Sequence, residues 1–414
     1  MSPTLRKYLS LFALGLAGGA SYFLPYIKYS FYDAQIAAMG ITHAQSGLLL
    51  TVYTIGNIIL YIPGGILADK LHPRWTIVIS CAVTGLLSFL YAMTMSYTLG
   101  IIIWLLLSFS TAFVFWSALM KAIRMVGEEK EQGLMYGFYY ACNGLSGAAT
   151  AAIALAVFNS RGNDIDGFKA AVNAGGVIVI VAAVLVAILL RDGKLTASAE
   201  EDKFHFSDLG YILRKPVIWI ISIVIFCGYG VYSCSSYFTP YLSEVCGLNT
   251  SETALVAVFR SYGFLLLAPV GGLIADKLFK NTAKWLAFIL TVIGILFLGM
   301  LLFGQSANAS FSIFYSLLIG ALCMMMYGTI FSMMSGAGIA RKFTGTAIGI
   351  ASIVGYLPDS FYSAMFGTWL DRYGGATGYP MIFSFLGVTA ILGAILAVVV
   401  LKLNKRSGEK LEEV

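Results

Sequence analysis

The stretch that decides the fold is PGGILADKLHPRW, residues 63–75, together with PVGGLIADKLFKNTAKW, residues 269–285. Both contain the string GGxxADKL, which begins at Gly64 and again at Gly271, 207 residues later in a chain of 414 residues. Each copy follows about twenty mostly apolar residues, the length of a helix that crosses a bilayer. A charged turn that recurs at half the chain length predicts an internally duplicated membrane protein.

The composition excludes a soluble protein. Hydrophobic residues make up 59% of the chain and charged residues 11%, whereas soluble domains carry about 25% charged residues. The sequence contains no nucleophile–base set, no metal-ligand spacing and no GxxxxGK[ST] phosphate loop. We therefore expect no enzyme, no cofactor and no metal.

The expected fold is all-α, with twelve transmembrane helices in two pseudo-symmetric bundles of six. We expect an N-terminal bundle over residues 1–190, a cytoplasmic linker over 191–215 and a C-terminal bundle over 216–414. The apolar segments that predict the helices are 7–32, 44–69, 75–97, 99–123, 132–158, 168–190, 216–242, 251–276, 284–304, 310–338, 344–370 and 378–403.

Basic residues predict the orientation in the membrane. With the N-terminus in the cytoplasm, 21 of the 26 Lys and Arg residues fall on the cytoplasmic side. We expect both termini in the cytoplasm and the chain in a cytoplasmic (inner) membrane, as a monomer surrounded by lipid. The net charge of +6 follows from this bias, so no nucleic-acid partner is expected.

Two further pairs of segments support the duplication. YFLPYI at 22–27 recurs as YFTPYL at 237–242, and GLMYG at 133–137 corresponds to GTAIG at 345–349. The pairs match helices 1, 2 and 5 to helices 7, 8 and 11. A parallel repeat of this kind relates two halves by an axis along the membrane normal.

The repeated turn is interpreted as a conformational latch, formed in one state and released in another. Its glycines allow close helix packing, and its aspartate ends the helix beside basic residues. The alternative is a plain helix stop. The latch residues are Gly64, Gly65, Asp69, Arg74, Gly271, Gly272 and Asp276.

These residues carry a resemblance to a known family. GGxxADKLHPR resembles the helix 2–3 loop signature of the major facilitator superfamily, and GTWLDRYG at 367–374 is similar to another recurring turn of that family. The resemblance covers the whole chain. One departure is Pro73, where the family often has glycine. The resemblance implies secondary transport by alternating access, without ATP hydrolysis.

Two charges inside predicted spans are the leading site candidates. Arg260 lies about ten residues, or about 15 Å, below the outer end of helix 8, and Asp359 lies at a similar depth in helix 11. A guanidinium can bind an anion through two parallel hydrogen bonds. A carboxylate at this depth can serve in a proton relay. Alternatively, the two side chains form a structural pair, or protonation of Asp359 frees Arg260 for the anion.

The resemblance extends to the anion-transporting branches of the family. Oxalate–formate exchangers and nitrate/nitrite porters carry a substrate-binding arginine on helix 8, which implies this role for Arg260. Nitrate porters have a second arginine where the repeat places Tyr53, so the resemblance argues against nitrate. Oxalate exchangers have a lysine on helix 11, where this chain has Asp359, which argues against oxalate.

Further candidates line the predicted helices. Lys28, with Asp33, is either an outer gate or a solvated helix end. The repeat-related tyrosines gate the outer side or simply pack, and residues of helices 4 and 5 line the first half. These further substrate-binding candidates are Tyr22, Tyr26, Tyr53, Trp116, Tyr140, Asn143, Tyr237 and Tyr241.

The expected function is transport of a small organic anion, a carboxylate or sugar acid, by proton symport or by exchange. Carriage of an amino acid or another zwitterionic or polar solute stays open, with Arg260 on the carboxylate and Asp359 on the amine. A third possibility is a membrane sensor that binds ligand without transporting it.

Cysteine labelling tests the orientation. In intact cells, a membrane-impermeant maleimide should label Gly162→Cys and leave Ser198→Cys unlabelled, because the basic residues hold the central loop in the cytoplasm. Lysed cells supply the positive control for the second site. External labelling of Ser198→Cys would reverse the orientation.

Overall fold

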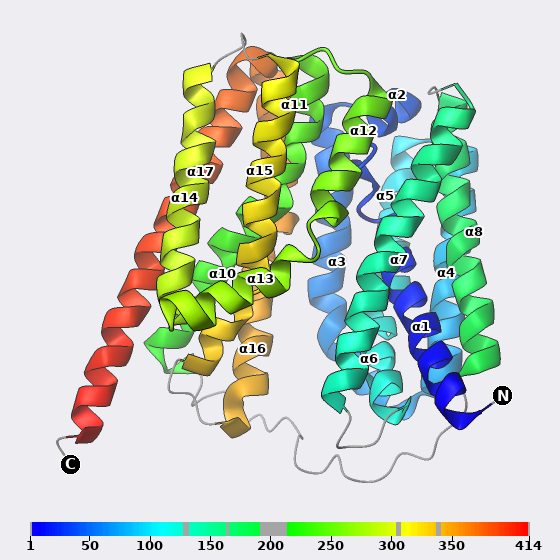
Figure 1. Cartoon of the computed structure of the whole chain (residues 1–414). Coiled ribbons are helices and arrows are strands. Elements are labelled where there is room, and N and C mark those ends of the chain that lie inside the picture. The colour runs from blue at the N-terminus through cyan, green and yellow to red at the C-terminus, as the bar shows by residue number, and fades with distance from the viewer. Residues whose placement is uncertain are drawn as a thin grey trace. The chain divides into compact units, whose positions relative to one another are not determined.

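The structure is a computed structural model of the chain. It describes residues 2–126, 132–162, 165–190, 213–303, 308–336 and 341–412. Within these ranges every regular element is a helix (Figure 1), so the all-helical fold class is confirmed. The chain forms two compact units, one of Met1–Thr196 with Leu248–Tyr262 and one of Ala197–Gly247 with Gly263–Val414.

The helices of the first unit begin and end at recognisable signals. Thr42 and Gln45 form a capping box at the start of α3, and Gly40 ends α2 with a left-handed φ of 61°. In chain order the helices are α1 (Pro3–Ser21), η1 (Ile27–Tyr29), α2 (Tyr32–Met39), α3 (His43–Lys70), α4 (Pro73–Thr94), α5 (Tyr97–Ser108), η2 (Phe109–Phe113), α6 (Phe115–Val126), α7 (Gln132–Ser160), α8 (Ile165–Leu189), α12 (Thr250–Val258) and η5 (Phe259–Gly263).

The second unit contains the remaining helices. The element α17 consists of two helices that meet at a kink at Gly374, where a φ of 68° suits glycine. The helices are α10 (Pro216–Cys234), η4 (Ser235–Tyr237), α11 (Phe238–Glu244), α13 (Leu267–Ile274), η6 (Ala275–Phe279), α14 (Thr282–Phe303), α15 (Ala309–Tyr327), η8 (Ile330–Gly336), α16 (Arg341–Gly355), η9 (Leu357–Ser360) and α17 (Tyr362–Glu412).

The chain has many helices that can cross a membrane. Among the described residues, nine helical stretches are long and apolar enough, or ten if a pair bent by 45° between Gly263 and Leu267 is one span. The stretch Ala347–Leu403 covers two of the predicted segments, and the backbone between them is non-helical at Gly374. The count of twelve spans therefore stays a prediction.

Both units are held by the same kind of helix contact. A Cβ added to Gly85 of α4 would lie 3.1 Å from the carbonyl oxygen of Gly176 in α8. A Cβ on Gly294 of α14 would lie 3.0 Å from the carbonyl oxygen of Gly387 in α17. Because lipid provides no hydrophobic drive between helices, such close backbone packing is a main source of association. The two halves thus repeat in their contacts as well as in their sequence.

The segment Leu248–Tyr262 belongs by its contacts to the first unit. Ser251 Oγ donates to Asn159 Oδ1 of α7 over 2.8 Å, and Thr253 Oγ1 lies 3.5 Å from Asp33 Oδ2 of α2. From its place in the chain we expected this segment in the second bundle. The division at residues 191–215 stays a prediction.

Candidate functional site

Three of the tyrosines expected at the site meet around Thr111 in the first unit. The Tyr53 hydroxyl lies 2.8 Å from Thr111 Oγ1, and the Tyr22 hydroxyl donates to the Thr111 carbonyl over 3.2 Å. The Tyr26 ring packs edge-on against Tyr53, with 5.7 Å between centroids. Thr111 lies in η2, a π-helical turn, and such turns are frequent at functional sites. Sequence analysis missed Thr111, because a π-turn has the same apolar pattern as an α-helix.

Arg260 is a buried cation in the first unit. It lies in the π-helical turn η5, and 3% of its surface is exposed. The flanking Val258 and Tyr262 pack against a buried apolar cluster that contains Tyr53. A charge at bilayer depth costs about 2.5–3.5 kcal/mol on insertion scales. This cost is the reason why Arg260 stays a site candidate.

Lys28 is buried too, with 3% of its surface exposed, so it is not a solvated helix end. Its ammonium lies 5.4 Å from the ring centroid of Tyr32, a cation–π contact. The Tyr32 hydroxyl lies 3.0 Å from His43 Nδ1 at the start of α3. Lys28 is therefore a second buried cation of the first unit.

Asp359 lies in the second unit, in the 3-10 turn η9, and is 2% exposed. The hydroxyls of Tyr229 and Ser233 donate to its two carboxylate oxygens, each over 2.5 Å. Hydrogen bonds of this kind to a charged acceptor contribute about 1.5–3 kcal/mol each. Both donors come from α10, four residues apart and hence on one helix face. That spacing could have identified them from sequence, but neither was predicted.

The candidates on helices 4 and 5 make packing contacts. Asn143 Nδ2 donates to the Tyr139 hydroxyl over 3.1 Å, and both side chains lie against Gly18 of α1. The Tyr140 ring lies 5.1 Å from Tyr139 and is 53% exposed. Trp116 of α6 is partly buried against an apolar cluster that includes residues of α1. The structure thus gives Asn143 a part in holding α7 against α1.

The second pair of repeat-related tyrosines packs on α17. Tyr237 is fully buried, and its hydroxyl donates to the Ser363 carbonyl over 2.8 Å. The Tyr241 ring lies 5.4 Å from the rings of Tyr379 and Phe383. Equivalent sequence positions therefore have different partners in the two units, since Tyr22 bonds to η2.

The first glycine of each repeated turn lies directly against a neighbouring backbone. A Cβ on Gly64 would overlap the carbonyl oxygen of Phe113, and one on Gly271 would overlap that of Met325. The second glycines are not crowded: a Cβ on Gly65 would have its nearest neighbour 3.7 Å away, and one on Gly272 would have none within 4 Å. The two copies of the turn therefore use the same glycine for helix packing.

The charged parts of the two copies differ. The first copy continues α3 to Lys70, and Lys121 of α6 donates to the carbonyls of Ala68 and Leu71 over 3.3 and 3.5 Å. Lys121 thus places a cation at the negative end of α3. The second copy forms the π-helical turn η6 and ends at Lys280, with a φ of 52°.

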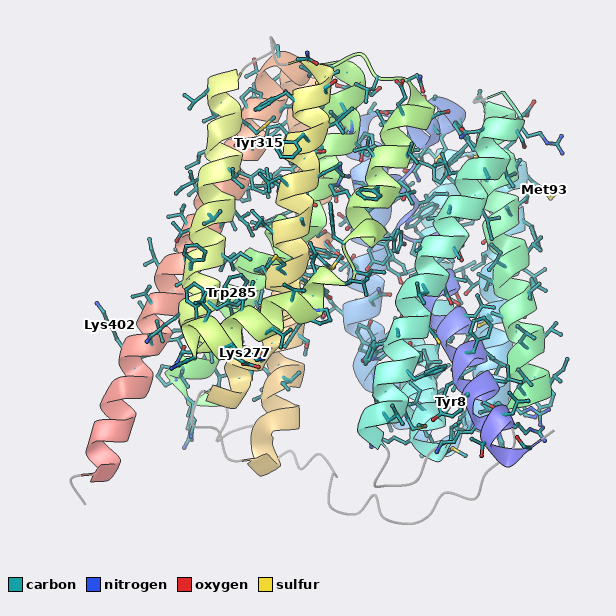
Figure 2. The ribbon with its side chains drawn as sticks, viewed as in Figure 1. Tyr8, Met93, Lys277, Trp285, Tyr315 and Lys402 are labelled. Atoms are coloured by element: carbon teal, nitrogen blue, oxygen red, sulfur yellow. The ribbon has the colours of Figure 1, made fainter. Side chains whose placement is uncertain are left out.

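The charged residues of the expected latch lie in different surroundings. Arg74 donates to the Ala187 carbonyl, and its guanidinium lies 5.0 Å from the Trp75 ring. Asp276 of η6 is exposed, as is Lys277, labelled in Figure 2. The Asp69 side chain lies outside the described part of the chain. The latch function therefore stays a prediction.

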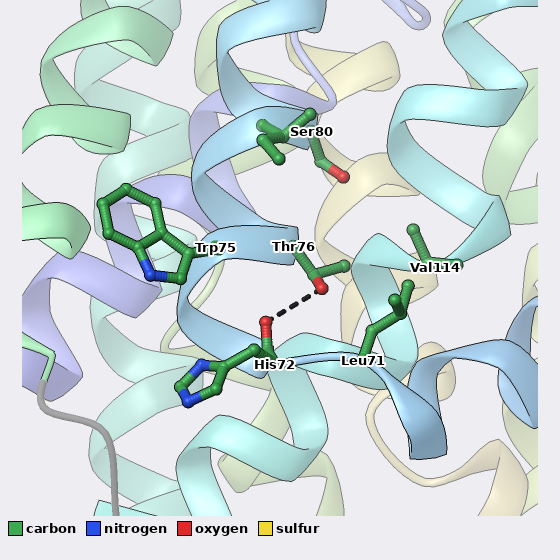
Figure 3. A pocket seen from close by; sticks show the side chains of 7 residues that line it. Leu71, His72, Trp75, Thr76, Ser80 and Val114 are labelled. Atoms are coloured by element: carbon green, nitrogen blue, oxygen red, sulfur yellow. Dashed lines mark hydrogen bonds between the residues drawn. The ribbon is translucent and has the colours of Figure 1, made fainter.

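A shallow pocket of about 260 Å³ lies beside the first turn (Figure 3). At its edge, Thr76 Oγ1 donates to the His72 carbonyl over 2.9 Å. The pocket is lined by Leu71, His72, Trp75, Thr76, Ile79, Ser80 and Val114. Its lining is mostly apolar, and it contains none of the site candidates named above.

A helical membrane protein with repeated helix contacts and buried charges in its spans has the architecture of a secondary transporter. The chain belongs to the Major Facilitator Superfamily, whose family model matches residues 8–363. This confirms the resemblance carried by the repeated turn and implies a small-molecule substrate.

Curated relatives cover nearly the whole chain. It is 29% identical to the inner membrane protein YihN of Escherichia coli K12, over 99% of each chain. It is 21% identical to a "Probable sulfoacetate transporter SauU" of Cupriavidus necator, over 90% of each chain. It is 24% identical to the membrane sensor protein UhpC of E. coli, over 86% of this chain and 85% of that protein.

A solved structure has the same fold. It is a bacterial homologue of the human lysosomal transporter Spinster, in an inward-facing and unoccupied conformation. The TM-score is 0.71 at 16% identity, covering 98% of this chain and 97% of that chain. At this identity the likeness shows the fold alone.

The glycine contacts of the repeated turn generate a matched test. Gly64→Ala should lower the melting temperature of the purified protein, because the new methyl group overlaps the Phe113 carbonyl; overpacking of this kind costs about 1–3 kcal/mol. Gly65→Ala, one residue away, should melt like the wild type. Equal melting temperatures for the two variants would contradict the contact. The second copy offers the same comparison in Gly271→Ala and Gly272→Ala.

Proposed function

We propose that this chain is a secondary active transporter that works by alternating access and moves a small organic anion, a carboxylate or sugar acid, by proton symport or exchange. The observation that carries the proposal is Arg260, a guanidinium 3% exposed in the bent helix pair that passes the length and hydropathy test for a span only when taken together. A planar guanidinium matches a carboxylate or sulfonate through two parallel hydrogen bonds. Arg260 is therefore assigned to the anionic group of the substrate.

The relatives support an anionic substrate. SauU is described as a probable sulfoacetate transporter, and sulfoacetate is a small organic acid with two anionic groups. Lys28 provides a second buried cation in the same unit as Arg260. Two buried cations in one unit favour binding of an anion over binding of a cationic drug.

Asp359 is assigned to proton coupling. Its carboxylate accepts hydrogen bonds from Tyr229 and Ser233, so it is fixed in place inside the second unit. The rings of Tyr232, Tyr327 and Tyr356 pack against Tyr229. Among the groups named here Asp359 carries the carboxyl group, and carboxyl groups within membrane spans often take part in proton relays.

The remaining assignments follow the sequence. Both termini lie in the cytoplasm, the membrane is the inner membrane, and the protein acts as a monomer. The repeated turns act as the latch, with Gly64 and Gly271 as packing points. Such switches work because a local change in charge or packing shifts the balance between two conformations.

Two alternatives remain. In the first, the substrate is an amino acid or another zwitterion, with Asp359 on its amine. In the second, the protein senses its ligand without transporting it, and the likeness to the membrane sensor protein UhpC favours this reading. Counterflow of labelled ligand in proteoliposomes separates a carrier from a sensor, because only a carrier exchanges ligand across the bilayer.

The anion assignment is tested at Arg260. Arg260→Lys keeps the positive charge but cannot form two parallel hydrogen bonds to the anion. The affinity for the anion, measured by isothermal titration calorimetry, should therefore fall about tenfold to a hundredfold. Arg161→Lys, at an exposed position, serves as the matched control and should bind like the wild type. Wild-type affinity in Arg260→Lys would remove this side chain from the site.

The stability of an Arg260 variant distinguishes an anion-binding role of Arg260 from a purely structural role. If Arg260 only completes a buried ion pair, Arg260→Gln leaves a buried charge alone and should lower stability by about 3–5 kcal/mol. The anion assignment instead predicts a large loss of binding with a smaller change in melting temperature. Both quantities come from the same purified variant.

Proton coupling is tested at Asp359. Asp359→Asn removes the ionisable group while keeping a side chain that accepts from Tyr229 and Ser233. Uptake driven by a pH gradient should be lost, whereas exchange of internal for external substrate should continue. Uptake by this variant that still follows the pH gradient would assign the proton to another residue.

A further inference from the structure

The shallow pocket beside the first repeated turn has a lining that is mostly apolar (Figure 3). Its volume of about 260 Å³ is below the roughly 300–1,000 Å³ of pockets that enclose a whole drug-sized ligand. Most of its lining comes from the start of α4, with Leu71 at the end of α3 and Val114 before α6. We call this pocket the α4 groove. Its size suits one part of a longer molecule.

The α4 groove begins at the membrane surface and runs into the membrane. α3 ends at Lys70 and α4 begins at Pro73, and each of these helices contains a stretch long and apolar enough to cross a bilayer. The turn that joins two spans lies at the surface of the membrane. Ser80, which lines the groove, follows seven residues after Pro73 and hence about 10 Å deeper. A molecule that follows the groove therefore has one end at the surface and the other at the depth of the acyl chains.

The apolar lining of the groove is open to its surroundings. Ile79 is 61% exposed, and Trp75 is 49% exposed. In a bilayer, exposed apolar side chains on a spanning helix contact the acyl chains of lipids. Trp75 is the third residue of α4, near the membrane surface, where tryptophan is enriched in membrane proteins. The lining thus has the chemistry of a contact with lipid.

Basic residues surround the end of the groove at the membrane surface. The Arg74 guanidinium lies 5.0 Å from the centre of the Trp75 ring, and Lys121 donates to the Leu71 carbonyl over 3.5 Å. Lys70, which precedes Leu71, is exposed. None of the seven lining residues is acidic. Each lysine or arginine near the surface attracts anionic lipid by its charge, whichever other groups it contacts.

We infer that the α4 groove binds an anionic phospholipid, with an acyl chain along the apolar lining and the headgroup beside Lys70 and Arg74. The groove lies within the first unit, and the inference is independent of the transported substrate. Lys70, Arg74 and Lys121 carry three positive charges, against the single negative charge of Asp69 in the same turn. The excess of positive charge complements an anionic headgroup.

Other occupants match the α4 groove less well. A zwitterionic lipid offers the same acyl chains, but its headgroup gains less from an excess of positive charge. A free organic anion lacks the chain that covers the apolar lining. A second copy of the protein needs a much larger surface than this groove, because stable interfaces bury about 1,200–2,000 Å².

Lipid binding to the purified full-length protein in detergent tests the inference. Native mass spectrometry gives the dissociation constant of the first bound lipid for phosphatidylglycerol and for phosphatidylcholine, each with the same palmitoyl and oleoyl chains. Phosphatidylglycerol carries a net negative charge, and phosphatidylcholine carries none. We expect phosphatidylglycerol to bind the wild type about tenfold or more tightly than phosphatidylcholine.

Two pairs of matched variants locate the lipid. Lys70→Glu should weaken binding of phosphatidylglycerol about tenfold, whereas Lys402→Glu, at an exposed lysine of α17 (Figure 2), should bind it like the wild type. Ile79→Ser should weaken binding of both lipids about threefold or more, because it removes apolar contact with the chain. Ile295→Ser, on α14 and 60% exposed, is its control and should bind both lipids like the wild type.

Melting temperatures of the four variants check their folding. If Lys70→Glu melts at a lower temperature than the wild type, Lys70→Gln takes its place, with an expected loss of about fivefold.

Three results would overturn the inference. The first is equal affinity of the wild type for the two lipids. The second is an affinity for phosphatidylglycerol that Lys70→Glu leaves unchanged, or that Lys402→Glu reduces as much, because the headgroup then lies elsewhere or is attracted by charge spread over the surface. The third is wild-type affinity for both lipids in Ile79→Ser, which would place the acyl chain outside the groove.

Discussion

Backbone-to-backbone contact between helices is the constraint on which the rest of the structure depends. Gly85 and Gly176 bring α4 against α8, and Gly294 and Gly387 bring α14 against α17. In lipid, apolar side chains gain nothing by leaving their surroundings for another helix, so close packing has to supply the association. The many glycines of the chain are the chemical means for this, and the same contact recurs in both units.

Because the helices pack this closely, the charged side chains inside each unit are surrounded by other protein groups. Asp359 is held by two hydroxyls of α10, and Arg260 and Lys28 are buried in the first unit. Charged side chains within membrane spans often mark substrate or ion pathways. The buried cations Arg260 and Lys28 are the basis of the proposal that the substrate is an anion.

The duplication preserves packing more strictly than local conformation. Gly64 and Gly271 have equivalent neighbours, yet the first turn is a regular helix end and the second passes through the π-helical turn η6. The repeat-related Tyr22 and Tyr237 likewise bond to different elements. The two halves therefore carry different polar groups although their glycine contacts are similar.

The sequence by itself determined the class of the protein, the duplication and the two charges inside predicted spans, Arg260 and Asp359. Apolar length, charge density and the repeated GGxxADKL string are local properties that a chain displays without folding. Only the tertiary structure decided that Thr111 meets Tyr22 and Tyr53, that Tyr229 and Ser233 hold Asp359, and that Leu248–Tyr262 packs with the first unit. These contacts join residues far apart in the chain, and hydropathy patterns carry no information on which helix faces meet.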